Sequence, residues 1–214
     1  MAFTYFFRDL QTLHLIRDHV IPDVRSRRYI KIWDAGCAMG PEPYSLAIIL
    51  RESMGSAFRN VKIYATDIDE SGHFGEIILG GEYPYDRLKR IPKGIFERYF
   101  RENGKPDHFV IAEELRRCVE YQRHDLLSLE PIRKNLALIV CKNVLLHFRK
   151  SERVNVLRMF HSALEKGGFL AMEQTQKLPR KVAGLFEPVV ANGQLFRKVE
   201  RGEVRYRPDT GQVS

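Results

Sequence analysis

A predicted strand, a turn with two glycines and a predicted helix follow one another between residues 29 and 50. Residues 29–33 are rich in β-branched and aromatic side chains, as in a buried strand, and residues 45–50 have the apolar character of a helix packed against it. Gly36 and Gly40 lie between them, where the missing Cβ lets the backbone come close to a ligand. This arrangement predicts an α/β fold with a cofactor cradle at the turn.

A second strand, expected over residues 60–65, leads to Asp67. In an open α/β sheet nucleotides bind at the carboxyl ends of the strands, and an acidic side chain there can accept both hydroxyls of a ribose. The glycine spacing matches neither the dinucleotide motif nor the phosphate loop. A ligand with a ribose and no phosphates therefore fits better, and S-adenosylmethionine is the expected one. Taken alone, the glycine turn and the distant acid can also be only a tight connection between a strand and a helix, with no ligand bound there.

Helices are expected over residues 10–20 and 151–165, with two short helical segments around Arg87 and Phe96. In the helix over 151–165, Val156, Leu157 and Phe160 fall on one face. Ser151 is the expected N-cap of this helix, and Gly167-Gly168 is expected to end it.

The later strands are predicted from apolar runs and turn residues. Residues 136–141 are entirely apolar, as in a buried strand, and residues 169–172 start another. Residues 107–111 and 116–121 are expected to pair as a hairpin. A terminal hairpin is expected from residues 186–190 and 194–199 about Asn192-Gly193.

The length of 214 residues fits a single α/β domain. No apolar run approaches the roughly 20 residues that cross a bilayer, and the first residues do not form a signal peptide. We therefore expect a cytoplasmic protein. Cys37, Cys118 and Cys141 show no paired metal spacing, so buried reduced thiols are expected.

The formal net charge of +8 favours a nucleic acid, a membrane surface or an acidic protein as partner. Residues 86–105 form the densest basic patch, with seven basic side chains against three acidic ones. From the sequence alone, a solvated helical face is slightly favoured over a docking surface.

Four motifs occur in order: Thr4-Tyr5-Phe6-Phe7-Arg8, the segment 35–45, Ala65-Thr66-Asp67-Ile68-Asp69 and the segment 141–148. Together they resemble the catalytic domain of the CheR family, the chemotaxis-receptor glutamate O-methyltransferases. The resemblance extends from Thr4 to about Lys198. It implies a class I S-adenosylmethionine-dependent methyltransferase with a Rossmann-like seven-stranded sheet and a small antiparallel β subdomain.

The resemblance also implies a domain organisation. We expect one methyltransferase domain over residues 1–200, with helical segments and the small β subdomain at about 84–122 for substrate docking, and a basic tail over 201–214. The family's amino-terminal helical domain has no counterpart here, which indicates a fragment or a minimal member. The implied partner is the cytoplasmic helices of a methyl-accepting chemotaxis receptor or a receptor-like protein, with no nucleic acid and no membrane insertion. The oligomeric state is not predicted.

The implied cofactor is S-adenosylmethionine, with S-adenosylhomocysteine as product and no metal. Asp67 would hold the ribose hydroxyls, Glu42 would face the amino-acid end of the cofactor, and Asp125 would accept from the adenine amino group. The other implied cofactor-binding residues are Thr4, Arg8, Gly36, Leu126, Lys142 and Asn143. From the residues alone, Glu42 can instead stabilise the first turn of its helix through the helix dipole, without contacting a ligand.

Methyl transfer from a sulfonium to a carboxylate needs positioning and exclusion of water more than a strong base, because a glutamate is already ionised at neutral pH. Arg8 matches the family's active-site arginine and is predicted to orient the carboxylate. His147 stands where the family has a tyrosine near the transferred methyl group. Both are assigned as catalytic. Without the family, Thr4–Arg8 is equally a hydrophobic staple before the first helix.

Several residues depart from the family pattern. Met172-Glu173-Gln174-Thr175 replaces Gly-His-Ser-Glu, and Ala2 replaces an asparagine. These departures, with His147, keep open a degenerate cofactor-binding sensor or scaffold. A nucleic-acid methyltransferase is disfavoured, because Asn143-Val144-Leu145-Leu146 lacks the proline and aromatic residues that would surround a flipped base.

Overall fold

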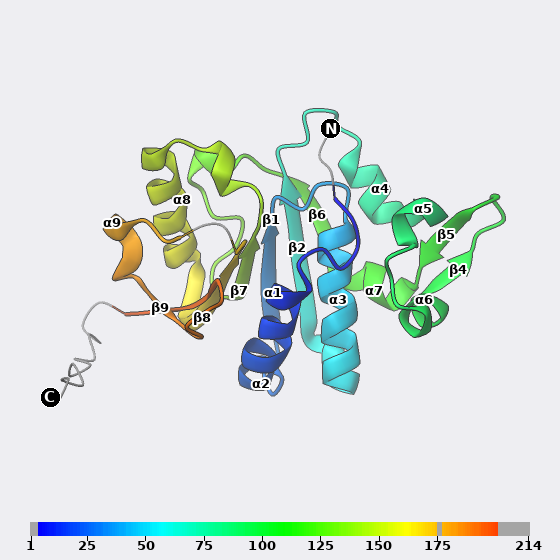
Figure 1. The fold of residues 1–214 in the computed structure, drawn as a ribbon, viewed down its shortest axis with the longest axis horizontal. Helices are drawn as coiled ribbons and strands as arrows, with labels where there is room; N and C mark the ends of the chain where they lie inside the picture. Colours follow the sequence, from blue (N-terminus) through cyan, green and yellow to red (C-terminus); the bar gives the residue numbers. More distant parts are fainter. Residues whose placement is uncertain (1–3, 175–176, 201–214) are drawn as a thin grey trace, which may run out of the picture.

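The chain folds around a seven-stranded sheet, in a computed structural model that describes residues 4–174 and 177–200 (Figure 1). The strand order is β6-β2-β1-β7-β8-β10-β9. The strands are β1 (Ile30–Ala35), β2 (Val61–Asp67), β6 (Val119–Arg123), β7 (Leu136–Cys141), β8 (Leu164–Met172), β9 (Phe186–Pro188) and β10 (Leu195–Lys198). Strands β6, β2, β1, β7 and β8 are parallel, whereas β10 is antiparallel to both of its neighbours. The expected sheet with an antiparallel terminal hairpin is confirmed.

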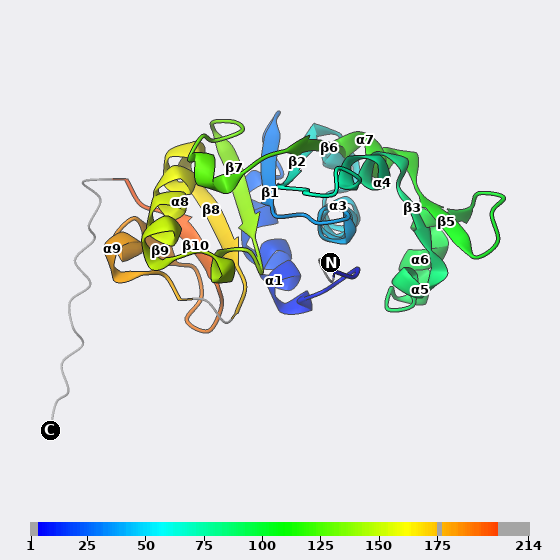
Figure 2. The ribbon, with the colours of Figure 1, turned by 90° about the horizontal axis from the view of Figure 1, so that it is seen from above.

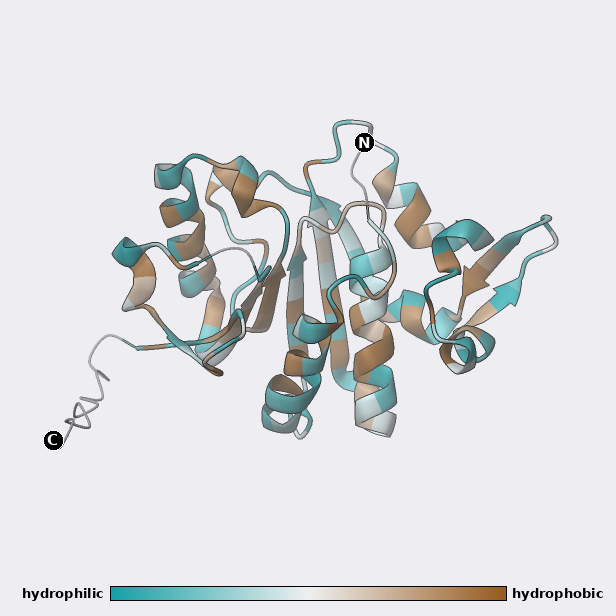
Figure 3. Cartoon of the chain, in the orientation of Figure 1, coloured by the Kyte–Doolittle hydropathy of each residue, from teal (hydrophilic) through white to brown (hydrophobic). Residues whose placement is uncertain are grey.

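Alternate residues of the central strands enter two separate apolar clusters, one on each face of the sheet. Ile30 and Ile32 of β1 belong to the cluster that includes side chains of α1 (Leu10–Leu15) and α3 (Pro41–Met54), whereas Trp33 packs with α8 (Lys150–Ala163). Helices therefore cover both faces, as a buried parallel sheet requires (Figure 2). Figure 3 shows the resulting pattern, with apolar residues concentrated along β7 and β8.

The opening helix is longer than expected, because α1 continues through the π-helical segment η1 (Ile16–Val20) into α2 (Ile21–Val24). The remaining helical elements are η2 (Gly55–Asn60), α4 (Phe74–Gly80), α5 (Tyr85–Leu88), α6 (Lys93–Tyr99), α7 (Glu113–Cys118), η3 (Leu126–Ser128), η4 (Leu145–His147) and α9 (Arg180–Ala183). Both predicted short segments, around Arg87 and Phe96, are helical. None of the helices in the described part of the chain is long and apolar enough to cross a membrane. The three cysteines are buried and unpaired.

The predicted hairpin between residues 107–111 and 116–121 is wrong. Strand β5 (His108–Ile111) pairs instead with β3 (Glu82–Pro84) and β4 (Phe100–Glu102) in a small antiparallel sheet, whereas β6 joins the main sheet beside β2. Glu113 and Glu114 lie in the first turn of α7, where the helix dipole favours carboxylates, and this helix separates the two strands. The small sheet lies at one end of the molecule, on the right in Figure 1.

The predicted boundaries of α8 are also corrected. The helix starts at Lys150 with Arg149 as N-cap, whose backbone N–H donates to the Glu152 carboxylate at 2.7 Å, so Ser151 is not the cap. It ends at Ala163, and Gly167-Gly168 lie inside β8. A Cβ on Gly168 would stand 2.8 Å from the Leu136 carbonyl oxygen, so this glycine permits a close approach of two strands where the register shifts.

Candidate active site

A cavity of about 810 Å³ opens at the carboxyl ends of β1, β2 and β7. This volume lies within the range of small-molecule sites. All ten residues that the sequence analysis singled out line it: Thr4, Arg8, Gly36, Glu42, Asp67, Asp125, Leu126, Lys142, Asn143 and His147. The fold thus brings together residues from the amino-terminal segment and from the ends of four strands, while their individual roles stay predictions.

The turn after β1 accepts only glycine at its first position. Gly36 has φ +101°, and a Cβ there would stand 2.1 Å from Cγ2 of Val144. Its backbone N–H donates to the Thr66 carbonyl oxygen at 2.7 Å. Ala38, two residues on, also has a positive φ of 47°, so the turn is strained where it meets the cavity. The missing Cβ therefore leaves room for the Val144 side chain, which also lines the cavity.

Asp67, at the end of β2, faces this turn. Its Oδ2 accepts the Ala38 backbone N–H at 2.9 Å, and its Oδ1 accepts the Asp69 backbone N–H at 3.1 Å. Each carboxylate oxygen has two lone pairs, so both retain acceptor capacity for hydroxyl groups. Asp67 therefore joins the two loops and presents acceptors to the cavity.

Asp69 supports the loop beneath Asp67. Its carboxylate accepts from the Tyr121 hydroxyl at 2.9 Å and from two backbone N–H groups, at Gly72 and Phe74. Burial opposes ionisation, but the hydrogen bonds from Ser71 and Tyr121 outweigh it and lower the pKa of the Asp69 carboxyl. The charged form therefore anchors the segment that precedes α4.

Lys142 and Glu42 form a buried ion pair at another wall of the cavity. Lys142 Nζ lies 3.0 Å from Glu42 Oε2, and the side chains are 2% and 13% exposed. Burial disfavours the charged amine, yet the Glu42 carboxylate raises the pKa of Lys142 above its ordinary value. Nζ also donates to the Arg8 carbonyl oxygen at 3.4 Å. The pair places one positive and one negative group side by side.

Asn143 has a left-handed backbone, with φ +59°. Its Oδ1 accepts from Arg8 Nη2 at 3.2 Å, and its backbone N–H donates to Oε2 of the buried Glu173 at 3.1 Å. Glu173 is not among the site residues predicted from the sequence. A carboxylate directly after an apolar strand, the signal that identified Asp67, would have pointed to it. Thr175 of the same motif lies outside the described residues.

The segment after β6 forms a further part of the cavity lining. Asp125 is exposed, and its Oδ1 accepts the Leu127 backbone N–H at 2.8 Å, which caps η3, while Leu126 is buried. His124, which the sequence analysis missed, also lines the cavity and meets the Trp33 ring edge-on at 5.7 Å between centroids. Burial lowers the pKa of His124, which favours the neutral imidazole at pH 7.

The amino-terminal segment is held by basic side chains of the region around α5. Arg87 Nη1 donates to the Thr4 carbonyl oxygen at 3.3 Å, and the Arg90 guanidinium lies 4.1 Å from the centroid of the Tyr5 ring. Thr4 is buried against the cavity, whereas His147 is exposed at its rim. Ala2 lies outside the described residues. Two arginines of the basic patch therefore position the segment that carries Arg8.

These groups suit a ligand of mixed polarity. One part of the cavity offers a carboxylate beside an ammonium group, another offers carboxylate acceptors at Asp67 and Asp125, and Leu126 and Val144 add apolar surface. Arg8 and His147 line the same cavity and can meet a second, anionic reactant.

Residues 2–193 match the family described as CheR methyltransferase, SAM binding domain. The chain is 31% identical to a chemotaxis protein methyltransferase of Borreliella burgdorferi, over 82% of this chain and 64% of that protein. It is 32% identical to one of Listeria innocua, over 81% and 64%, and to chemotaxis protein methyltransferase 2 of Pseudomonas aeruginosa, over 96% and 69%. The chain thus spans about 64% of the length of the first two relatives.

Among solved structures, the rRNA methyltransferase AviRa of Streptomyces viridochromogenes superposes with a TM-score of 0.55 at 15% identity, covering 92% of this chain and 85% of that one. At this identity the likeness concerns the fold alone. It agrees with the seven-stranded sheet described above.

Proposed function

Because the chain belongs to the CheR methyltransferase family, we propose that it transfers methyl groups from S-adenosylmethionine to glutamate side chains of a chemotaxis receptor or receptor-like protein. The observation that carries this proposal is the gathering of all ten predicted site residues around one cavity. Because the implied substrate segments are cytoplasmic helices, the reaction is placed in the cytoplasm.

The cavity suits this cofactor. Gly36 lines the cavity beside Val144, whose side chain occupies the space that a Cβ on Gly36 would need. Asp67 would accept the ribose hydroxyls, and Glu42 with Lys142 would bind the ammonium and carboxylate groups of the methionine end. When bound, S-adenosylmethionine supplies a methyl group on a sulfonium whose departure as a neutral thioether requires no proton.

The protein's remaining task is to hold the substrate carboxylate in line and to exclude water. Arg8 would orient that carboxylate, and Asn143 fixes the Arg8 guanidinium through the hydrogen bond at 3.2 Å. His147, at the rim, would cover the reacting groups from the solvent side.

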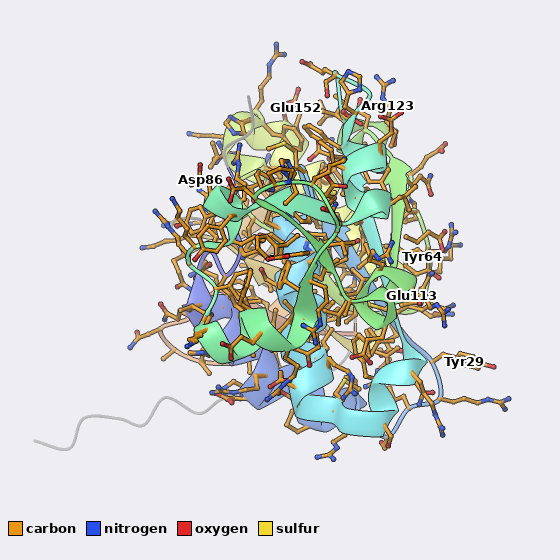
Figure 4. All side chains as sticks on the ribbon, turned by 90° about the vertical axis from the view of Figure 1, so that its right-hand side faces the viewer. Tyr29, Tyr64, Asp86, Glu113, Arg123 and Glu152 are labelled. Carbon is orange, nitrogen blue, oxygen red and sulfur yellow. The ribbon has the colours of Figure 1, made fainter. Side chains whose placement is uncertain are left out.

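The basic segment 86–105 is proposed as the docking surface for an acidic receptor helix bundle. Several of its cations already have acidic partners, with N···O distances of 3.7 Å for Lys93–Glu97 and 2.8 Å for Lys105–Glu82. These pairs are exposed and worth little individually, so a receptor carboxylate can replace the internal partner. Figure 4 views the molecule from this end, with Asp86 on one margin of the face and Glu113 on the other.

The test uses this chain, labelled S-adenosylmethionine and membranes from the same organism. We expect methyl label on a receptor, released by mild base, because an ester is base-labile and methylated nitrogen is not. Base-stable label would contradict glutamate methylation. Tight cofactor binding without label on any protein would favour the sensor or scaffold instead.

A further inference from the structure

A second buried carboxyl group lies behind Glu42. Asp34 of β1 is completely buried, and neither of its oxygens has a hydrogen-bond donor among residues 4–174 and 177–200. Glu42 Oε1 is likewise without a donor in the described part of the chain, while Glu42 Oε2 pairs with Lys142. The two carboxyl groups lie within hydrogen-bonding reach of each other. Two ionised carboxylates cannot form that bond, because both only accept.

The charges around Asp34 decide which group holds the proton. Lys142 is the cation that acts on this pair, and its ion pair with Glu42 balances a single negative charge. From the other neighbouring elements, Asp67 adds negative charge, and the thiols of Cys37 and Cys141 stay neutral because burial raises the pKa of each. An ionised Asp34 would leave one buried charge without compensation, which burial strongly disfavours.

Burial, followed by the Glu42 carboxylate, raises the pKa of Asp34 well above its ordinary value. A protonated Asp34 removes the conflict, since its hydroxyl can donate to the unsatisfied Glu42 Oε1. Glu42 then has a donor on each oxygen, Asp34 on one side and Lys142 on the other. Its carboxylate is therefore held between two groups that differ in charge.

We propose that Asp34 is a positioning residue that remains protonated and, through a hydrogen bond to Glu42, fixes the carboxylate that receives the ammonium group of the cofactor. This inference rests on the proposed function, because Glu42 is the group that meets the cofactor. Asp34 itself does not line the cavity. The role requires a neutral donor at this position and no negative charge.

Two substitutions at Asp34 distinguish the role of a neutral hydrogen-bond donor from the role of a negative charge and from that of side-chain bulk alone. Asp34→Asn keeps the shape and supplies an N–H donor without a charge, whereas Asp34→Leu has similar bulk and no donor. We expect calorimetric affinity for S-adenosylhomocysteine within about threefold of wild type for Asp34→Asn, and at least about tenfold weaker for Asp34→Leu. Equal losses in both variants, or no loss in Asp34→Leu, would overturn the inference.

Infrared spectroscopy tests the proton without any cofactor. The wild-type protein should show the carbonyl stretch of a buried protonated carboxyl at neutral pH, and Asp34→Asn should lack it. Absence of this band from the wild type would refute a protonated Asp34. If Asp34→Leu fails to fold, the infrared measurement alone tests the inference. Failure of the wild type to bind S-adenosylhomocysteine would instead count against the proposed function, while the band would still report on Asp34.

Discussion

The buried carboxylate of Glu173 accepts the backbone N–H of Asn143 at 3.1 Å, across the ends of β8 and β7. Asn143 lies in a left-handed conformation, and its side chain in turn accepts from Arg8. Glu173 thus fixes a backbone conformation on which a cavity residue depends.

Removing that acceptor should destabilise the protein. Glu173→Ala leaves the Asn143 N–H without its carboxylate, which is expected to cost about 1–3 kcal/mol in the free energy of unfolding, measured by urea titration. Glu173→Gln retains an acceptor oxygen and should lose less. Because Asn143 contacts Arg8, turnover should also fall more in Glu173→Ala than in Glu173→Gln. Equal stability of Glu173→Ala and wild type would show that the bond contributes nothing.

The glycine turn and the acidic strand end were visible in the sequence because both signals are local. Gly36 and Asp67 follow apolar strands, and parallel strands bring such ends to one edge of the sheet. Residues that follow different parallel strands therefore line one cavity.

What the sequence could not predict depends on distant partners. The residues of β6 suit either a hairpin with β5 or a parallel edge strand. Helix α7 lies between β5 and β6 in the chain, and β6 pairs with β2 instead. Similarly, Asp34 resembles any acidic residue near a turn until the fold buries it beside Glu42 and Lys142. The Arg149 cap replaced Ser151 because Glu152 reaches back to the Arg149 N–H.

Asp67→Ala should weaken binding of S-adenosylhomocysteine by about 1–3 kcal/mol, the scale of lost hydrogen bonds to a charged acceptor. Because Asp67 also accepts from Ala38 and Asp69, part of this loss can come from the loop. A ligand analogue without ribose hydroxyls separates the two effects. Its affinity should change much less than that of the parent compound, and an equal change would remove the ribose assignment.

The docking surface should be tested away from the residues that hold the amino-terminal segment. Lys93 and Lys105 are exposed, whereas Arg87 and Arg90 contact Thr4 and Tyr5. Reversing both lysines to glutamate should raise the apparent KM for receptor and reduce its salt dependence, with unchanged cofactor affinity. Arg25→Glu combined with Arg59→Glu, two exposed changes outside this segment that alter the net charge by the same amount, is the matched control. Equal effects of the control would show that only net charge matters.

The protonated Asp34 also predicts a pH dependence of stability. Its pKa is raised in the fold, so the folded protein keeps a proton that the unfolded chain releases near pH 3.9. Stability therefore falls as pH rises from about 4 towards the folded-state pKa. Asp34→Asn has no such proton, and its stability relative to wild type should increase with pH across this window. Unfolding from pH 4 to 8 measures it.

An exposed carboxyl provides the control for that series. Lys89 lowers the pKa of Asp86, so its contribution to stability runs in the opposite direction. Asp86→Asn should show no increase in relative stability with pH. A difference between Asp34→Asn and wild type that stays constant with pH would contradict the protonated carboxyl.

Turnover depends on how the substrate carboxylate is held. If Arg8 orients the substrate carboxylate, Arg8→Ala should lower kcat at least about tenfold, or 1.4 kcal/mol in the barrier, while cofactor affinity falls less. The guanidinium is held by Asn143, so Arg8→Lys, which cannot keep the same fork geometry, should recover only part of the rate. His147 is exposed at the rim, where His147→Tyr has room and should maintain or raise kcat. Single-turnover methylation of receptor, with calorimetric cofactor affinity measured on the same variants, separates the two effects. If kcat of Arg8→Ala matches wild type while cofactor affinity falls, the arginine serves the cofactor and the carboxylate is oriented by other groups.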